Sequence, residues 1–229
     1  MNKMSAIVAV KLPVTMEIQE YERSISYISV ERRNQLDRFA RQEDAYRSLF
    51  GELLVRAVIC QELGLLNEEI HFVKNDYGKP MLLGHEDFNY NISHSGCWVV
   101  MIRGQGAVGI DIEMIQKSDL EIARRFFSPL EFNDLISRPE SERNTYFYDL
   151  WTLKESYIKA IGTGLSTPLD SFSIRLKENH FMLETNDEGC KFTQFDIDPA
   201  YKLSACSLGT PLPASIQIYD YKDLVNHLA

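Results

Sequence analysis

A repeated order of predicted elements constrains the fold of this chain more than any other feature of its sequence. The stretch EDAYRSLFGELLVRAVICQELGL, residues 43–65, has apolar residues at helical spacing and reaches a terminal glycine at Gly64. Three strand-like runs follow it: EIHFVKN, FNYNIS and CWVVMIR. About one hundred residues later, NTYFYDLWTLKESYIKAIG is helical, ends at Gly162 and precedes SFSIRL, FTQFDI and YKLSACSL. The order helix, strand, strand, strand therefore occurs twice.

We interpret this order as an internal duplication, although an α+β protein without a duplication could also show it. The interpretation predicts an α+β fold of two similar subdomains, 1–105 and 106–229, that form a pseudo-dimer split near Gly104 to Gly106. Two such halves would bury their sheets and helices against each other and place an active site in the cleft between them. Because one chain would already close this cleft, we predict a monomer.

The overall composition excludes several classes of protein. The chain has 229 residues and a formal net charge of −9, which argues against nucleic-acid binding. Its first apolar run, before Lys11, is too short for a signal or membrane segment, so we predict a first strand there and no membrane association. Four scattered cysteines without a C-x-x-C pair predict reduced thiols in a cytoplasmic protein.

The stretch AVGIDIE, residues 107–113, places two carboxylates inside an apolar run. In a strand, Ile110 and Ile112 would face the core, whereas Asp111 and Glu113 would share the opposite face about 7 Å apart. A solvated outer face would explain these charges without any function.

The second predicted helix carries Trp151, Glu155 and Lys159 at four-residue spacing, and therefore in one row. An exposed Glu155–Lys159 ion pair would contribute only about 0.3–0.5 kcal/mol. If Glu155 instead meets Asp111 and Glu113, three like charges converge in a half-buried place and require a cation. Oxygen donors without Cys or His suit Mg²⁺ or Mn²⁺, which favours a phosphate-bearing substrate.

Three further polar clusters are candidates for phosphate binding, and each has a structural alternative. As structural alternatives, DYGKPML could be a plain hairpin turn with a solvated Lys79, and NISHSG could be a turn after Ser93 and His94. The stretch VERRNQLDRFARQEDAYRS could be a solvated helix face around Arg32. A serine hydrolase would need a G-x-S-x-G elbow, which the sequence lacks, as it lacks P-loop, Rossmann and kinase motifs. Phosphate chemistry without a nucleotide-binding loop is a narrow class.

Taken together, these motifs resemble the signature of the 4′-phosphopantetheinyl transferases, most closely the pseudo-dimeric Sfp-type branch. VGIDIE (108–113) precedes LWTLKESYIKAIGTGLSTPL (150–169), and NDYGKP, FNYNISHSG and RRFFSPLE extend the match over residues 30–206. The resemblance implies two α+β subdomains and transfer of the phosphopantetheine arm of coenzyme A to a serine of an acyl or peptidyl carrier protein. Adenosine 3′,5′-bisphosphate would be released, and the modification would serve antibiotic or lipid biosynthesis.

The resemblance also implies roles for individual residues. The Mg²⁺ ligands would be Asp111, Glu113 and Glu155, and Lys159 would contact the coenzyme A diphosphate. The phosphates would further be bound by Ser93, His94, Arg32 and Ser48, and the adenine pocket would be lined by Tyr77, Gly78, Lys79 and Pro80. Where the family often has a second lysine after Arg32, this chain has Gln35, which we leave out of the predicted site.

Two points beyond the binding residues remain open from the sequence. Glu155 is our first candidate and Glu131 our second for accepting the proton of the carrier serine. For docking of the carrier we expect the segment ARRFFSPLEF, residues 123–132, with charge from Arg124 and Arg125 and apolar contact from Phe126 and Phe127. Core packing of both phenylalanines is the alternative.

Two other functions would use the same residues. A Mg²⁺-dependent nucleotide or diphosphate hydrolase would use water as its nucleophile, so no protein serine would gain mass. A non-catalytic module would bind coenzyme A and leave it intact, but it would have no need for the set Asp111, Glu113, Glu155 and Lys159. We therefore predict catalysis, with Glu155 and Lys159 as the catalytic residues.

Overall fold

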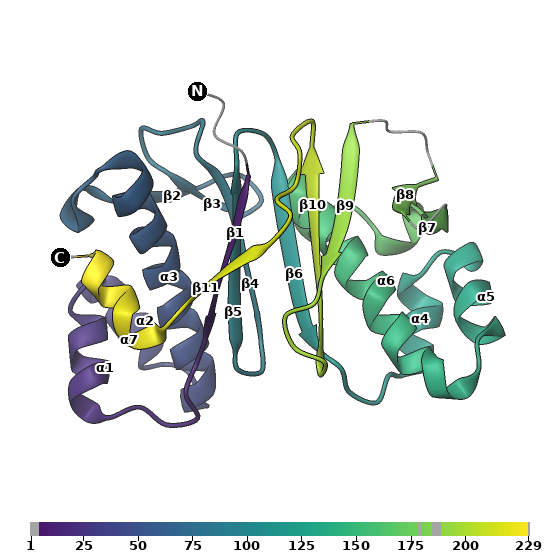
Figure 1. Cartoon of the computed structure of the whole chain (residues 1–229), viewed down its shortest axis with the longest axis horizontal. Helices are drawn as coiled ribbons and strands as arrows, with labels where there is room; N and C mark the ends of the chain where they lie inside the picture. The colour runs from purple at the N-terminus through teal and green to yellow at the C-terminus, as the bar shows by residue number, and fades with distance from the viewer. Residues whose placement is uncertain (1–4, 178–179, 185–188, 229) are drawn as a thin grey trace.

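Figure 1 shows a computed structural model of the chain, which describes residues 5–177, 180–184 and 189–228. Its N-terminal half contains β1 (Ala6–Lys11), α1 (Ile18–Ile25), α2 (Val30–Leu36), α3 (Gln42–Leu63), the 3-10 turn η1 (Asn67–Glu69), β2 (Phe72–Lys74), β3 (Pro80–Leu82), β4 (Asn89–Ser95) and β5 (Trp98–Gly104). Its C-terminal half contains β6 (Val108–Met114), α4 (Leu120–Phe126), α5 (Pro129–Ser137), α6 (Glu140–Ile161), the 3-10 turns η2 (Gly164–Ser166) and η3 (Leu169–Ser171), β7 (Ile174–Lys177), β8 (His180–Leu183), β9 (Cys190–Phe195) and β10 (Tyr201–Leu208).

The two halves repeat one another in topology. In the first half a long helix precedes a two-stranded sheet, β2–β3, and then the antiparallel pair β4–β5; in the second half α6 precedes β7–β8 and then β9–β10. The strand that opens each half pairs with the last strand of that series, which gives the orders β1-β5-β4 and β6-β10-β9. The predicted α+β fold of two similar halves is therefore confirmed.

The sheets lie side by side in the middle of the molecule, with α3 outside one and α6 outside the other (Figure 1). Alternation along the strands produces this layering, because successive side chains face opposite sides of a sheet. In β1, Val8 and Val10 join the core under α3, whereas Ile7 and Ala9 join the core between the sheets. From β6, Ile110 enters the same core between the sheets.

Both long helices are 22 residues long and end as the sequence predicts. Gly64 follows α3 with φ 69° and Gly162 follows α6 with φ 73°. Only glycine adopts this left-handed conformation readily, so each glycine terminates its helix. None of the helices in the described ranges is long and apolar enough to cross a membrane.

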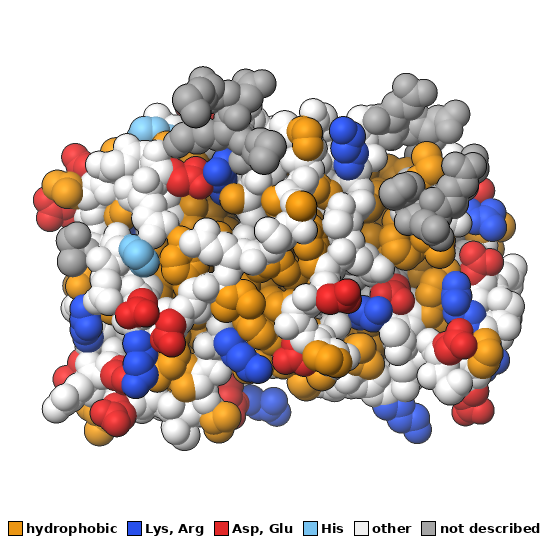
Figure 2. Space-filling view, viewed as in Figure 1, with side chains coloured by type: hydrophobic (Ala, Val, Ile, Leu, Met, Phe, Trp, Pro, Cys, Tyr) orange, Lys and Arg blue, Asp and Glu red, His pale blue; other side chains and the backbone are white. Residues whose placement is uncertain are grey.

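The C-terminal segment returns to the N-terminal half. Strand β11 (Ile216–Tyr219) pairs in parallel with β1 at the edge of the first sheet, and α7 (Tyr221–Leu224) and the 3-10 turn η4 (Val225–His227) follow it. Leu224 and Val225 are buried in the core under α3. The boundary at residues 105 and 106 stays a prediction, but the segment 216–228 packs on the first half rather than on the second. Figure 2 shows apolar side chains gathered in the middle of this face, where Figure 1 places β1, β11 and β10.

Candidate active site

A cavity of about 990 Å³ receives side chains from both halves of the molecule. The residues in it come from α2, α3, the β2–β3 hairpin and β4 on one side, and from β6 and α6 on the other. It brings together ten of the residues that the sequence singled out: Arg32, Ser48, Gly78, Pro80, Ser93, His94, Asp111, Glu113, Glu155 and Lys159. Trp151 lines it as well, so the predicted row on α6 does face the site.

The three carboxylates lie close enough to influence one another. Asp111 is 3% exposed, while its strand neighbours Ile110 and Ile112 are buried in the core on the opposite face, as alternation predicts. Burial, and then the charge of Asp111, raise the pKa of both Glu113 and Glu155 above the ordinary value. The carboxylates of the strand and the helix are therefore close to one another, a contact that the sequence analysis had to assume.

Asp111 has one satisfied and one unsatisfied oxygen. Its Oδ1 accepts hydrogen bonds from Lys159 Nζ at 2.6 Å and from Ser93 Oγ at 2.9 Å. Its Oδ2 is buried and has no hydrogen-bond partner within the described part of the chain. A buried carboxylate oxygen without a partner is costly, and a hard cation is a suitable partner for it.

The side chains do not form a finished metal cluster in this structure. Among residues 5–177, 180–184 and 189–228, no three or more His, Cys, Asp or Glu side chains are gathered closely enough to hold a metal ion. The unpartnered oxygen of Asp111 and the nearby carboxylates of Glu113 and Glu155 nevertheless fit Mg²⁺ in their chemistry, because all three offer oxygen donors.

Gly109 allows α6 to approach the strand that carries the carboxylates. A Cβ atom at this position would lie 2.0 Å from the carbonyl oxygen of Ser156 and 2.4 Å from the backbone nitrogen of Ala160. Helix backbone therefore packs directly on strand backbone, as glycine in a strand permits. This contact places Glu155 and Lys159 beside Asp111.

Polar side chains of β4 join the two halves along β6. Asn91 Oδ1, Ser93 Oγ and Ser95 Oγ accept hydrogen bonds from the backbone nitrogens of Ile110, Ile112 and Met114, at 2.9, 3.3 and 3.1 Å respectively. Ser95 Oγ also donates to Glu113 Oε2 at 2.8 Å. The alternating residues of one strand thus satisfy the alternating donors of the other, and they hold the carboxylates at the same time.

Cationic groups surround His94 at the same end of the cavity. Burial lowers the pKa of His94, and the positive charges of Arg47 and Lys159 lower it further, whereas Asp44 opposes them. Arg47 Nη1 donates to the carbonyl oxygen of Gly96 at 2.8 Å, and the guanidinium forms an ion pair with Asp44. The positive charges beside His94 favour an anionic group at that place in the cavity.

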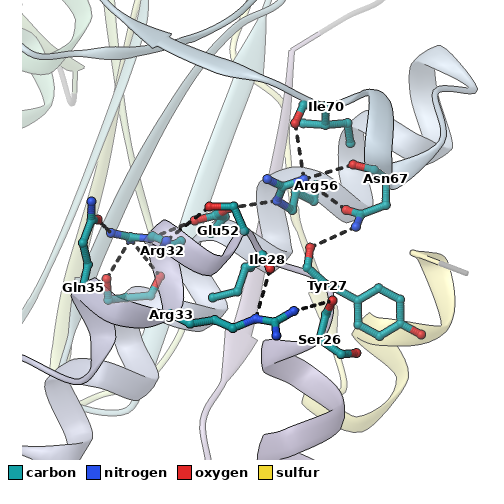
Figure 3. A network of polar contacts seen from close by, with 12 residues as sticks. Ser26, Tyr27, Ile28, Arg32, Arg33, Gln35, Glu52, Arg56, Asn67 and Ile70 are labelled. Carbon is teal, nitrogen blue, oxygen red and sulfur yellow. Dashed lines mark hydrogen bonds and ion pairs between the residues drawn. The ribbon is translucent and has the colours of Figure 1, made fainter.

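Arg32 reaches from α2 to α3 and is held there by several bonds (Figure 3). Its Nη2 donates to Ser48 Oγ at 2.8 Å, its Nη1 to Gln35 Oε1 at 3.0 Å and its Nε to Glu52 Oε2 at 2.8 Å. The structure therefore brings Arg32 and Ser48 together, as expected, and adds Glu52 to them. Gln35, left out of the predicted site, lines the same cavity.

Two members of the DYGKP turn, Tyr77 and Lys79, are not among the residues that line the cavity. Lys79 Nζ donates to the carbonyl oxygens of Lys159 at 2.8 Å and Val108 at 3.3 Å, so its amine connects the two halves, and burial lowers its pKa. The carbonyl of Lys159 is one of the last in α6, where a cation from outside the helix is favourable. Tyr77 is 60% exposed, whereas Gly78 and Pro80 line the cavity.

Glu131 is buried away from solvent and fully engaged. Its side chain is 1% exposed, and its oxygens accept hydrogen bonds from Lys154 Nζ and from the backbone nitrogens of Ser128 and Ile174. It caps α5 through the Ser128–Glu131 capping box. Glu131 therefore has no free oxygen lone pair directed at the cavity, and Glu155 is the better candidate for the base.

The segment expected to dock the carrier is only partly on the surface. Phe127 is 2% exposed and packs on Phe147 in the core, so for this residue core packing is the correct alternative. Phe126 is half-buried with its ring edge-on to Trp151, and Arg124 and Arg125 are exposed. Docking through the remaining residues stays a prediction.

Sequence reasoning did not assign the face of α3 that lines the cavity. Ser48, Glu52 and Arg56 follow one another at four-residue spacing and all line the cavity, together with Arg47. The spacing could have revealed the row, as it did for the row on α6. Its charges were obscured by the many other charges of the same stretch, residues 31–56.

Comparison with known families and proteins gives a consistent result. Residues 107–206 match the 4′-phosphopantetheinyl transferase superfamily, and residues 15–105 match the family described as 4′-phosphopantetheinyl transferase, N-terminal. The 4′-phosphopantetheinyl transferase Sfp of Bacillus subtilis is 41% identical over 210 residues, which cover 90% of this chain and 94% of that protein. The 4′-phosphopantetheinyl transferase gsp of Aneurinibacillus migulanus is 39% identical over 201 residues, 87% and 84% of the two chains.

A solved structure overlaps a smaller part of the chain. The holo-[acyl-carrier-protein] synthase (AcpS) of Thermotoga maritima covers 46% of this chain and 64% of its own, at 20% identity and a TM-score of 0.39.

Proposed function

Because the chain belongs to the 4′-phosphopantetheinyl transferase superfamily, we propose that it moves the 4′-phosphopantetheine arm of coenzyme A onto a serine of an acyl or peptidyl carrier protein. The matches that support this cover both halves of the chain. The single observation that carries the proposal is the cavity between the halves, which Asp111, Glu113, Glu155 and Lys159 line together with Arg32, Arg47 and His94.

The cavity suits a long anionic co-substrate. Its volume of about 990 Å³ is at the upper end of ordinary ligand sites. Arg32, Ser48 and His94 lie on one wall, and we assign them to the 3′-phosphate of coenzyme A. Gly78 and Pro80 line the cavity on the β2–β3 side, and we assign them to the adenine; Lys74, which pairs with Pro80, lines the same part. Ser93 is 7% exposed and bonded to Asp111, so we assign it to the support of that carboxylate rather than to direct phosphate contact.

We assign Asp111, Glu113 and Glu155 as the residues that would hold Mg²⁺, or Mn²⁺ in its place. The support is the buried, unpartnered Oδ2 of Asp111 together with two further carboxylates whose pKa values are raised by burial and by the charge of Asp111. When bound, the ion would offset the negative charge of the coenzyme A diphosphate.

The reaction forms one bond and breaks one. The serine oxygen of the carrier attacks the phosphorus that bears the pantetheine arm, and the bond from that phosphorus to the bridging diphosphate oxygen breaks. Adenosine 3′,5′-bisphosphate leaves with that oxygen. Glu155 accepts the serine proton, directly or through a water, and Lys159 donates a hydrogen bond to the oxygens that gain negative charge.

We further propose that the protein acts as a monomer in the cytoplasm. Residues of both halves already line one cavity within a single chain, so a second copy is not needed to complete the site. The scattered cysteines favour a reducing compartment.

Intact-mass spectrometry of an apo carrier protein tests the proposed function. With this protein, coenzyme A and Mg²⁺, the carrier should gain about 340 Da, the mass of one phosphopantetheine arm. Glu155→Gln should abolish the gain, whereas Glu142→Gln, an exposed position on the same helix, should preserve it. Cleavage of coenzyme A without a mass gain would indicate a hydrolase, and bound but intact coenzyme A would indicate a binding module.

A further inference from the structure

The wall that we assign to the 3′-phosphate contains a carboxylate with no part in the phosphoryl transfer. Glu52 lies on α3, its side chain is 13% exposed, and it lines the cavity. A carboxylate beside a phosphate repels it, and this reduces the attraction of the surrounding arginines. Its position therefore suggests a role other than direct contact with the ligand.

Glu52 bridges two guanidinium groups (Figure 3). Its Oε2 accepts from Arg32 Nε at 2.8 Å, and its Oε1 accepts from Arg56 Nε at 2.9 Å. Arg56 in turn donates from Nη1 to the backbone oxygen of Asn67 at 3.1 Å and that of Ile70 at 3.5 Å. One carboxylate thus connects α2 with α3, and through Arg56 it connects both with the turn before β2.

The bonds from Arg32 fix its guanidinium while leaving one N–H donor for a ligand. Glu52 holds Nε, Gln35 holds Nη1 and Ser48 holds Nη2. A guanidinium has five N–H donors. Nη2 also donates to the Ser48 carbonyl oxygen at 3.5 Å, so one N–H of Nη1 stays available for a ligand. The Arg32 side chain is 31% exposed, and the residue lines the cavity.

We propose, resting on the proposed function, that Glu52 is a positioning residue that orders Arg32 for the 3′-phosphate of coenzyme A. An arginine that is free to rotate loses conformational entropy when a ligand immobilises it. Glu52 orders this side chain before the ligand binds, so binding of the phosphate causes little further loss of conformational entropy in Arg32. Glu52 thereby sets how well the enzyme distinguishes coenzyme A from 3′-dephospho-coenzyme A.

A purely structural role is the competing explanation, because Glu52 also neutralises Arg56, whose side chain is only 8% exposed. The two roles differ in what they affect. Loss of a structural ion pair lowers stability and affects both coenzyme A forms alike. Loss of the positioning role acts on the form that carries the 3′-phosphate.

The experiment compares Glu52→Gln with the wild type in two measurements. The first is the ratio of kcat/KM for coenzyme A to kcat/KM for 3′-dephospho-coenzyme A. The second is calorimetric binding of adenosine 3′,5′-bisphosphate without a carrier. We expect both the ratio and the affinity to fall roughly threefold to tenfold, the cost of immobilising one flexible side chain, with the loss mainly in KM for coenzyme A.

Arg33→Ala is the matched control. Arg33 belongs to the neighbouring part of the network and donates to the backbone oxygens of Ile28 at 3.2 Å and Ser26 at 3.1 Å (Figure 3). Its loss should lower the melting temperature while leaving the ratio unchanged. Should Glu52→Gln fail to fold, the double variant Glu52→Gln/Arg56→Met leaves no buried arginine unpaired, and its ratio must fall by the same amount.

The outcomes separate this inference from the proposed function. A folded Glu52 variant with a wild-type ratio overturns the positioning role, even if Arg32→Ala lowers the ratio. If Arg32→Ala also leaves the ratio unchanged, the assignment of the 3′-phosphate to this wall is wrong, and the inference fails with it. A wild-type ratio in Arg33→Ala together with a reduced ratio in Glu52→Gln supports the inference.

Discussion

Glu131 and Lys154 form an ion pair inside the C-terminal half, and replacing Glu131 with glutamine tests what this pair does. The side chains are each 1% exposed, so solvent screens their interaction little. Lys154 Nζ lies 2.7 Å from both carboxylate oxygens and also donates to the carbonyl oxygen of Phe172 at 2.7 Å. Glutamine retains the shape of glutamate but has one acceptor oxygen, and its NH₂ group would face an ammonium.

The expected destabilisation follows from the charge left behind. Removing one partner of a buried ion pair costs about 3–5 kcal/mol, because the other charge stays buried without compensation. For a chain of this size, each kcal/mol lowers the melting temperature by about 2–4 °C, so we expect a decrease of roughly 6–20 °C. Part of that loss reflects the bond from the Ser128 nitrogen, which caps α5.

Thermal melts and activity measured well below the melting temperature provide the test. The double variant Glu131→Gln/Lys154→Met removes both charges and should recover a large part of the lost stability. In either variant, kcat/KM of the folded protein should stay near the wild-type value. A Glu131→Gln protein as stable as the wild type but more than about tenfold less active would refute the reasoning. Glu131 would then again be a candidate for the base that accepts the serine proton.

Two further substitutions test how the halves are joined. Lys79→Met removes the donor to the carbonyls of Lys159 and Val108, and chemical denaturation should show a loss of about 1–3 kcal/mol; unchanged stability with weaker coenzyme A binding would show that Lys79 contacts the ligand instead. Gly109→Ala would place a methyl group 2.0 Å from backbone, so we expect a lower melting temperature and little activity. Gly51→Ala is its control, because its Cβ would meet nothing closer than 3.7 Å, and melting at the wild-type temperature or above is expected.

Local periodicity was sufficient to predict which faces of the strand and the helix line the cavity. Alternation in a strand separates Asp111 from Ile110, and four-residue spacing in a helix groups Glu155 with Lys159, whatever the rest of the chain does. The terminal glycines of the long helices were equally readable, because a left-handed residue leaves a local signal. Periodicity could not predict that this strand and this helix contact each other, because the contact depends on the close packing at Gly109.

The features that sequence reasoning missed depend on partners that lie far apart in the chain. Lys79 resembles a ligand-binding lysine, and only the tertiary structure places the end of α6 against its amine. The return of residues 216–228 to the first sheet depends on the free edge of β1, which no local pattern reveals. Glu131 is different, because Ser128 and Glu131 match a capping box, a local pattern from which its structural role could have been predicted but was not.

The internal duplication clarifies why Glu52 differs from Glu131. Arg56 lies eight residues before Gly64, and Lys154 lies eight residues before Gly162, so the two buried cations hold the same place in the two halves.

Each of these cations donates to a carbonyl two residues before the next strand, Ile70 before β2 and Phe172 before β7. The anchoring of that turn is therefore common to both halves. The carboxylate that pairs with the cation differs between the halves. In the second half it is Glu131, which comes from α5 and is buried in the core. In the first half it is Glu52, which comes from the same helix as Arg56 and lines the cavity. An anchor needs only the bond to its own cation. The further bonds of Glu131 come from backbone nitrogens, whereas Glu52 accepts one from a second cation, Arg32. The coenzyme A discrimination experiment measures the effect of that bond.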